Sequence, residues 1–122
     1  MASGSHPHHG IDYVEIPALD LDAAKRFYGE SFGWRFNDYG PGYVGFVDGA
    51  RGDQEAGGFR KEAAIQAGGP LVILYSRDLE ATFERVRSAG GAITKPIFEF
   101  PGGRRFQFTD PSGNELAVWA TK

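Results

Sequence analysis

The chain has 122 residues, enough for one compact domain or for two very small halves that share a core. Thirteen basic against sixteen acidic residues give a net charge of −3, so the chain has no general attraction to nucleic acid or to an anionic membrane. It contains no cysteine, which excludes disulfides, zinc–thiolate sites and thiol nucleophiles. Because the longest clean apolar run, Leu71 to Tyr75, is too short to span a bilayer, we expect a cytoplasmic protein.

The first ten residues, MASGSHPHHG, are small, polar and turn-prone, and they predict a flexible leader over 1–10. All three histidines of the chain, His6, His8 and His9, lie in this leader. The body of the chain therefore has no histidine, which excludes a Ser-His-Asp triad there. A histidine-based metal site would have to recruit the leader.

A strand-like run, IDYVEIP, opens the body of the chain and leads to a predicted helix. Asp20 is a good N-cap, because its carboxylate can accept hydrogen bonds from free N–H groups of the first turn. The apolar residues that follow lie at helical spacing, and Gly33 is placed to end the helix in the left-handed conformation. Three more strand-like runs come next: WRFND, GYVGFVD and GGFRK. The predicted order is βαβββ.

The same order recurs later in the chain. The segment DLDA at Asp20 is matched by DLEA at Asp78, an offset of 58 residues, and Gly33 is matched by Gly91 at the same offset. The second copy begins with LVILYS, is capped by Asp78 and ends its helix at Gly90 or Gly91. It continues as AITKPIFEF, RRFQFTD and NELAVWA, so it also reads βαβββ.

The repeat predicts an α+β fold made of two βαβββ modules, the first over residues 11–62 and the second over 69–120, which together form one domain. Pro96 is expected at an edge or a bulge, because proline cannot donate a ladder hydrogen bond. Side chains alternate between the two faces of a strand. One face of each curved mixed sheet should therefore pack on its helix, and the other can line a concave cleft.

Alternation places Val14, Ile16, Leu116 and Val118 on the helix side of their strands. The opposite side combines aromatic rings with a few polar groups, which is the usual composition of a small-ligand site. The predicted ligand-binding residues on that side are Tyr13, Glu15, Ile73, Tyr75, Arg105, Gln107 and Trp119. The same residues could instead form core between two sheets or a homodimer interface, and the pattern leaves this open.

Two segments, DLDAAKRFYGESFGW and FTDPSGNELAVW, together with the two βαβββ units, resemble the vicinal-oxygen-chelate superfamily over about residues 10–120. This superfamily includes glyoxalases, extradiol dioxygenases and the fosfomycin and bleomycin resistance proteins. The resemblance implies a homodimer, because members of this family often bury their sheet edges in that way.

Metal-dependent members of that family hold a divalent ion with His or Glu at the first strand of each module and Glu at the last. By motif register these positions fall on Tyr13, Leu71, Ala117 and a site near Gly57 or Gly58. Leucine and alanine offer no donor, and a tyrosine ligand would have to ionise. Besides Glu15, the remaining carboxylate near these positions is Glu55. We therefore expect neither a metal site nor a cofactor.

Three functions follow from the resemblance and the residues. The first is a metal-free binding protein for a small aromatic molecule, with Tyr13, Tyr75 and Trp119 for stacking and Glu15 for a cationic or hydrogen-bond-donating group. The second is a metal-free isomerase or lyase with Glu15 as the catalytic base and Arg105 stabilising an enolate. The third is a metal-dependent glyoxalase-type lyase, isomerase or dioxygenase with non-standard ligands. Whether the protein is an enzyme is left open.

Overall fold

The computed structural model describes residues 6–66 and 68–122. Of the predicted leader, residues 1–5 lie outside the described residues, while His6 to Gly10 are exposed and include a turn closed by the hydrogen bond from Gly10 N to Pro7 O (3.1 Å). The flexibility of the leader stays a prediction.

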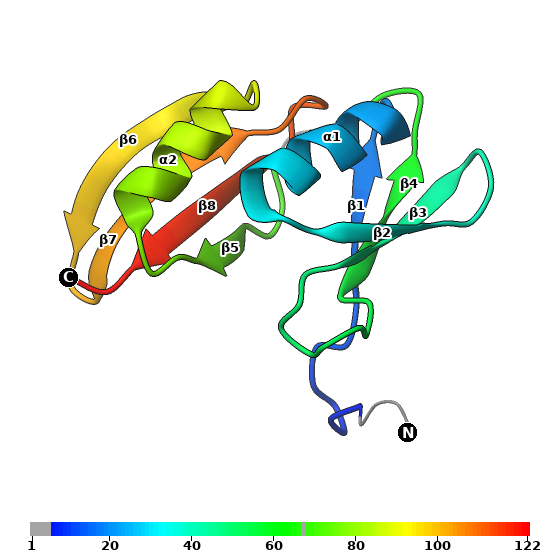
Figure 1. Cartoon of the computed structure of the whole chain (residues 1–122), viewed down its shortest axis with the longest axis horizontal. Coiled ribbons are helices and arrows are strands. Elements are labelled where there is room, and N and C mark those ends of the chain that lie inside the picture. Colours follow the sequence, from blue (N-terminus) through cyan, green and yellow to red (C-terminus); the bar gives the residue numbers. More distant parts are fainter. Residues whose placement is uncertain (1–5, 67) are drawn as a thin grey trace.

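Each half of the chain forms one four-stranded mixed sheet and one helix (Figure 1). In the first half the sheet order is β1-β4-β3-β2, and in the second it is β5-β8-β7-β6. The first and last strand of each half pair in parallel, and the other pairs are antiparallel. The elements are β1 Val14–Ala18, α1 Leu21–Phe32, β2 Arg35–Asp38, β3 Tyr43–Val47, β4 Gly57–Lys61, β5 Val72–Tyr75, α2 Leu79–Ser88, β6 Ala92–Phe100, β7 Gly103–Thr109 and β8 Glu115–Ala120. The predicted α+β fold with two βαβββ modules is confirmed.

The helices begin at the predicted caps. Asp20 accepts a hydrogen bond from Ala23 N at 3.0 Å, and Asp78 accepts one from Ala81 N at 3.1 Å. Gly33 ends α1 with a φ of 74°, a left-handed conformation that glycine adopts without strain. In the described residues, no helix is both long and apolar enough to cross a membrane.

The helix-facing sides of both sheets share one core, because α1 and α2 lie next to each other (Figure 1). Residues predicted on these sides, including Ile16, Leu116 and Val118, are buried, and Val14 packs against the same cluster. The largest fully buried side chains are Tyr28, Phe27, Phe59, Phe106, Phe108, Leu79 and Leu116. We call the opposite side of each sheet its outer face.

The turn between β7 and β8, residues 110–114, joins the second module to the first. Ser112 Oγ accepts a hydrogen bond from Leu19 N at 2.8 Å, and Asn114 Nδ2 donates to Pro17 O at 2.7 Å. Pro17 and Leu19 lie at and just beyond the end of β1. These bonds therefore help to hold the two outer faces in their relative position.

A buried carboxylate supports this turn from inside. Asp110 is 6% exposed and accepts hydrogen bonds from the backbone N–H groups of Ser112 and Asn114 and, at 2.9 Å, from the hydroxyl of Tyr28 on α1. Burial and the neighbouring Asp110 carboxylate hold the pKa of Tyr28 well above its usual value. Tyr28 is therefore a neutral donor at physiological pH, and it connects the first helix to the turn of the second module.

Candidate functional site

The outer face of the first sheet carries a group of phenols and carboxylates that meet at Glu55. Glu55 lies in the loop before β4, and its side chain reaches back across β3. One carboxylate oxygen accepts from Tyr13 at 2.9 Å, and the other accepts from Tyr39 at 2.6 Å and Asn37 at 2.8 Å. In the part of the chain that the structure describes, no Lys, Arg or His lies within ion-pair distance of this carboxylate.

Two glycines make room for these side chains. Gly58 and Gly45 are paired neighbours on β4 and β3, at the centre of one row across the sheet. A Cβ added at Gly45 would lie 2.3 Å from an oxygen of Glu55, and one at Gly58 would lie 2.2 Å from the hydroxyl of Tyr43. Both side chains therefore lie flat on backbone that has no side chain of its own.

The hydrogen bonds set the protonation states of this group. Burial, with the bonds to Tyr43 and Glu55, raises the pKa of the Tyr13 phenol far above its usual value. Burial alone would raise the pKa of Glu55 too, but the bonds from Tyr39, Asn37 and Tyr13 outweigh it and hold that pKa below its ordinary 4.5. At neutral pH the phenol of Tyr13 stays protonated and Glu55 is ionised.

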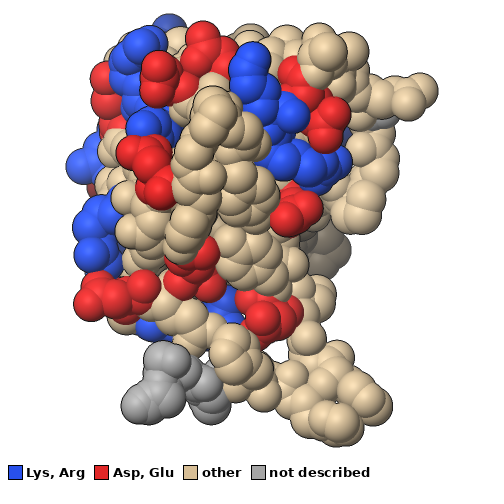
Figure 2. Space-filling view, turned by 90° about the vertical axis from the view of Figure 1, so that its right-hand side faces the viewer, with Lys and Arg blue, Asp and Glu red and all other residues tan. Residues whose placement is uncertain are grey.

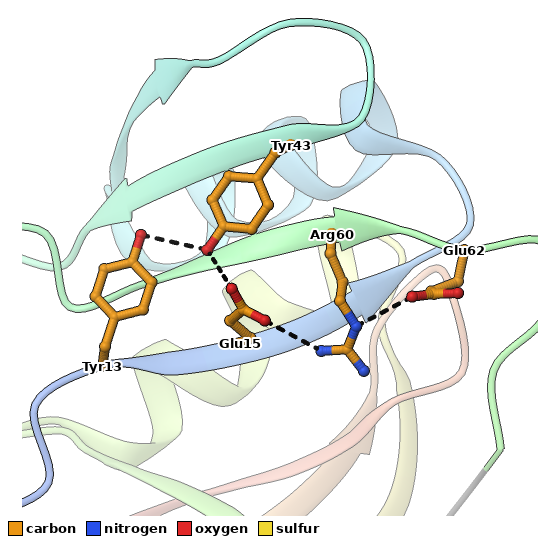
Figure 3. Close-up of polar contacts among 5 residues, drawn as sticks. All are labelled: Tyr13, Glu15, Tyr43, Arg60 and Glu62. Carbon is orange, nitrogen blue, oxygen red and sulfur yellow. Dashed lines mark hydrogen bonds and ion pairs between the residues drawn. The ribbon is translucent and has the colours of Figure 1, made fainter.

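Glu15, the predicted base, lies beside this group and accepts a hydrogen bond from Tyr43 at 3.0 Å (Figure 3). The hydroxyl of Tyr43 also lies 3.4 Å from that of Tyr13, which can accept its proton in place of Glu15, while Tyr13 donates its own proton to Glu55. On its other side Glu15 lies 3.8 Å from Arg60, which is closer to Glu62 at 3.1 Å. Glu15 is thus a half-exposed acceptor engaged with a phenol and an arginine.

The outer face of the second sheet holds the other five predicted ligand residues. Ile73 and Tyr75 on β5 are 44% and 54% exposed. Trp119 on β8 contacts the ring of Tyr75 edge to face, with 5.2 Å between ring centroids, and lies 6.2 Å from the ring of Phe100 on β6. An aromatic surface is therefore open beside the parallel pair β5 and β8.

Polar groups continue this face across β7. Glu115 accepts hydrogen bonds from Thr94 at 2.7 Å and from the amide nitrogen of Gln107 at 3.0 Å, and both lower its pKa. The amide oxygen of Gln107 in turn accepts from Arg105 at 3.0 Å. The three groups form a chain in which glutamine separates the arginine from the carboxylate.

The seven predicted residues thus divide into two groups, one on each outer face. In the described ranges, the hydrogen bonds and ion pairs link Tyr13 and Glu15 to first-module partners only. A hollow of about 320 Å³ lies between the modules, lined by Glu15 and Arg60 on one side and by Asn114 and Glu115 on the other. The ligand-binding role of all seven residues stays a prediction.

Figure 2 presents the first-module end of the molecule, and no broad field of one sign covers that side. There, Lys and Arg side chains are interspersed with Asp and Glu around a band of uncharged residues. This side of the molecule therefore offers no general attraction to a ligand of one sign.

The strand register locates the four positions at which the resemblance implies metal ligands. Glu15 pairs with Gly58, and Ile73, its counterpart in the second module, pairs with Ala117. Gly58, rather than Gly57, is therefore the counterpart of Ala117. The four positions hold Tyr13, Gly58, Leu71 and Ala117.

This donor set does not fit a divalent ion. It supplies no imidazole or carboxylate, and its one phenol oxygen, on Tyr13, stays protonated because the pKa of that phenol is raised. Glu55 does approach Tyr13, as the sequence suggested, but its oxygens are occupied by three hydrogen-bond donors. Within 6–66 and 68–122, no three His, Asp or Glu side chains gather closely enough to hold a metal.

Sequence reasoning missed several residues of these faces, among them Asn37, Tyr39 and Tyr43. Period-two alternation could have found Tyr43, because its neighbour Val44 faces the core. The reach of Glu55 across Gly45 could not have been found in this way, since a loop residue has no fixed face.

The chain belongs to the Glyoxalase/Bleomycin resistance protein/Dioxygenase superfamily, whose family pattern matches residues 10–118. It is 32% identical over 121 residues to a glyoxylase-like domain-containing protein of Didymella fabae, covering 91% of this chain and 93% of that protein.

A second relative is the putative glyoxylase CFP32 of Mycobacterium bovis, 28% identical over 115 residues, covering 88% of this chain and 44% of that protein. The chain thus spans less than half the length of CFP32. Among solved structures, TnmS3, an antibiotic binding protein from Streptomyces sp. CB03234, superposes with a TM-score of 0.68 at 20% identity, over 100% of both chains. This likeness shows a shared fold.

Proposed function

We propose that the protein binds a small aromatic organic molecule against the outer face of the second sheet. The observation that carries the proposal is the contact of exposed Tyr75 with the partly buried ring of Trp119, with exposed Ile73 beside them. An apolar patch rimmed by polar groups such as Gln107 typically marks a binding site. The description of TnmS3 as an antibiotic binding protein agrees with a small organic ligand.

Binding in this proposal needs no divalent ion. The support is the donor set at the four family positions, where Gly58, Leu71 and Ala117 have no ligating atom and Tyr13 keeps its proton. Stacking on aromatic rings, by contrast, needs only surface that is already exposed.

Binding is favoured over turnover by the positions of the two groups that an acid–base reaction would use. Glu15, the candidate base, belongs to the outer face of the first sheet, and Arg105, the candidate enolate stabiliser, belongs to that of the second. Among the described residues, Glu15 contacts Tyr43 and Arg60, whereas Arg105 contacts Gln107, and no hydrogen bond or ion pair joins Glu15 to Arg105.

We also propose that two copies of the chain associate as a homodimer. The support is exposed apolar area away from the ligand surface, with Ile11 87% and Tyr39 60% exposed. Light scattering on purified protein should give the mass of two chains. The mass of one chain at all accessible concentrations would exclude the homodimer.

Calorimetric titration with 2-naphthamide and anthracene-2-carboxamide tests the binding proposal. We expect at least one of these uncharged probes to bind, with an affinity that excess EDTA leaves unchanged. Trp119→Ala should weaken binding about tenfold or more, because a central tryptophan typically dominates such a contact. Tyr39→Ala, which removes an exposed ring from the other sheet, should leave it unchanged. Binding that EDTA abolishes and a divalent ion restores would refute the metal-free proposal, and no binding by either probe would refute the site.

A further inference from the structure

Arg104 and Arg105 follow one another on β7 and face opposite sides of the sheet. Arg104 is paired with Glu80 of α2 through two contacts of 2.5 and 3.3 Å. Arg105 has no carboxylate within ion-pair distance among the described residues. One of two adjacent guanidinium charges is therefore neutralised by contact, and the other is not.

Arg105 is held in place by aromatic rings. Its guanidinium carbon lies 5.3 Å from the ring centroid of Phe98 and 5.9 Å from that of Phe100, both within cation–π range. Its Nε is buried and has no hydrogen-bond partner in the described part of the chain. A buried N–H without an acceptor is costly unless another group compensates it.

The neighbour that could neutralise Arg105 is kept away from it. Glu115 is the ionised carboxylate of this face, but it is bound by Thr94 and by the amide nitrogen of Gln107. This bond turns the amide oxygen of Gln107 toward Arg105. Gln107 thus supplies Arg105 with a neutral acceptor and leaves the positive charge available.

The register places this charge next to the aromatic surface. Tyr75, Trp119, Arg105 and Phe98 are successive cross-strand partners on β5, β8, β7 and β6. Directly opposed residues in a sheet have Cβ atoms about 5 Å apart. A planar ring stacked against Trp119 would therefore carry its substituent over Arg105.

We propose that Arg105 is an anion-binding residue and that the ligand is an aromatic acid whose carboxylate or comparable anionic group pairs with this guanidinium. The inference rests on the proposed function, since the ring of the ligand occupies the Tyr75–Trp119 surface. A carboxylate can take two parallel hydrogen bonds from a guanidinium, which fixes the ligand in orientation as well as in position.

The test compares 2-naphthoate with its uncharged counterpart, 2-naphthamide, by calorimetric titration. The wild-type protein should bind the carboxylate about tenfold tighter, the size expected of one charge-assisted interaction. Arg105→Gln should remove this preference and leave the affinity for 2-naphthamide within about twofold. Arg104→Gln, the matched control on the same strand, should retain the preference.

Arg105→Lys separates charge from geometry. It keeps the cation but loses the planar fork, and it should show a reduced preference for the carboxylate. Unaltered 2-naphthamide binding by each variant reports that the face is intact. Equal binding of the two probes by the wild-type protein, or a preference that survives in Arg105→Gln, would overturn the inference while leaving the proposed function in place. If neither probe binds, both fall.

Discussion

The side chain of Glu55 lies on the backbone of Gly45, so the substitution Gly45→Ala should displace it. The new Cβ would lie 2.3 Å from one carboxylate oxygen and 2.7 Å from the other, whereas ordinary van der Waals contact begins at 3.4 Å. The carboxylate must therefore retreat by about 1 Å. Hydrogen bonds of 2.6 Å from Tyr39 and 2.8 Å from Asn37 do not survive such a displacement.

The consequence is a change in the pKa of Glu55. With the donors in place, hydrogen bonding outweighs burial and holds this pKa below 4.5. Without them the burial effect remains, so we expect the pKa of Glu55 in Gly45→Ala to rise to or above its ordinary value. The free energy of unfolding should change little. Alanine lowers the conformational entropy of the unfolded chain, which stabilises the folded protein by about 0.5–1 kcal/mol and offsets the loss of the exposed hydrogen bonds to Glu55.

Carbon-detected NMR titration of the glutamate carboxyl groups measures this directly, with the Glu55 signal assigned through Glu55→Gln. Gly42→Ala is the matched control, since a Cβ at Gly42 meets nothing within 4 Å and should leave the titration of Glu55 unchanged. If Glu55 in Gly45→Ala titrates at the wild-type pH, the glycine does not serve as the floor of this cluster and the reasoning is wrong.

Two further predictions concern stability. Tyr28→Phe removes the hydroxyl that donates to buried Asp110 and should lower the free energy of unfolding, measured with urea, by about 1.5–3 kcal/mol. The control Tyr39→Phe, at an exposed hydroxyl, should lower it by less than about 1 kcal/mol. Equal losses in the two variants would contradict the buried link between the modules. Because the pKa of Glu55 is lower in the folded protein, its contribution to stability is complete above pH 4.5 and is lost as the pH falls through the folded-state value. Acid unfolding of Glu55→Gln should therefore show a shallower dependence on pH below about 5 than the wild type, and an unaltered slope would refute this assignment.

The fold could be predicted because its signals are local and repeated. Asp20 and Asp78 lie at the same offset as Gly33 and Gly91, and both aspartates cap helices in the structure. The second helix differs in detail at its end: Gly90 has the positive φ, of 100°, whereas Gly91 packs closely against Val86 and Phe27. Alternation also placed side chains of β1 and β8 correctly on the core side.

The candidate site was harder to predict, for two physical reasons. Period-two alternation of side chains fails where a strand is irregular. The register of β6 against β7 shifts between Lys95 and Phe98, around Pro96. The position of Phe98 opposite Arg105 therefore cannot be derived by alternation from Ala92. Periodicity also says which face of its own sheet a residue occupies, but not how two sheets sit together. Glu15 lies on the first sheet and Trp119 on the second, and alternation alone could not say how near to each other they come.

The central claim is that an aromatic ligand occupies the outer face of the second sheet without a metal ion. NMR mapping of the metal-depleted protein during titration with 2-naphthamide tests it most directly. The account predicts the largest shifts at the Trp119 indole, the Tyr75 ring and the Ile73 methyl groups, with the methyl groups of buried Val44 in the first module unaffected. Shifts that appear only after a divalent ion is added, or that centre on Tyr13 and Glu55 instead, would contradict it.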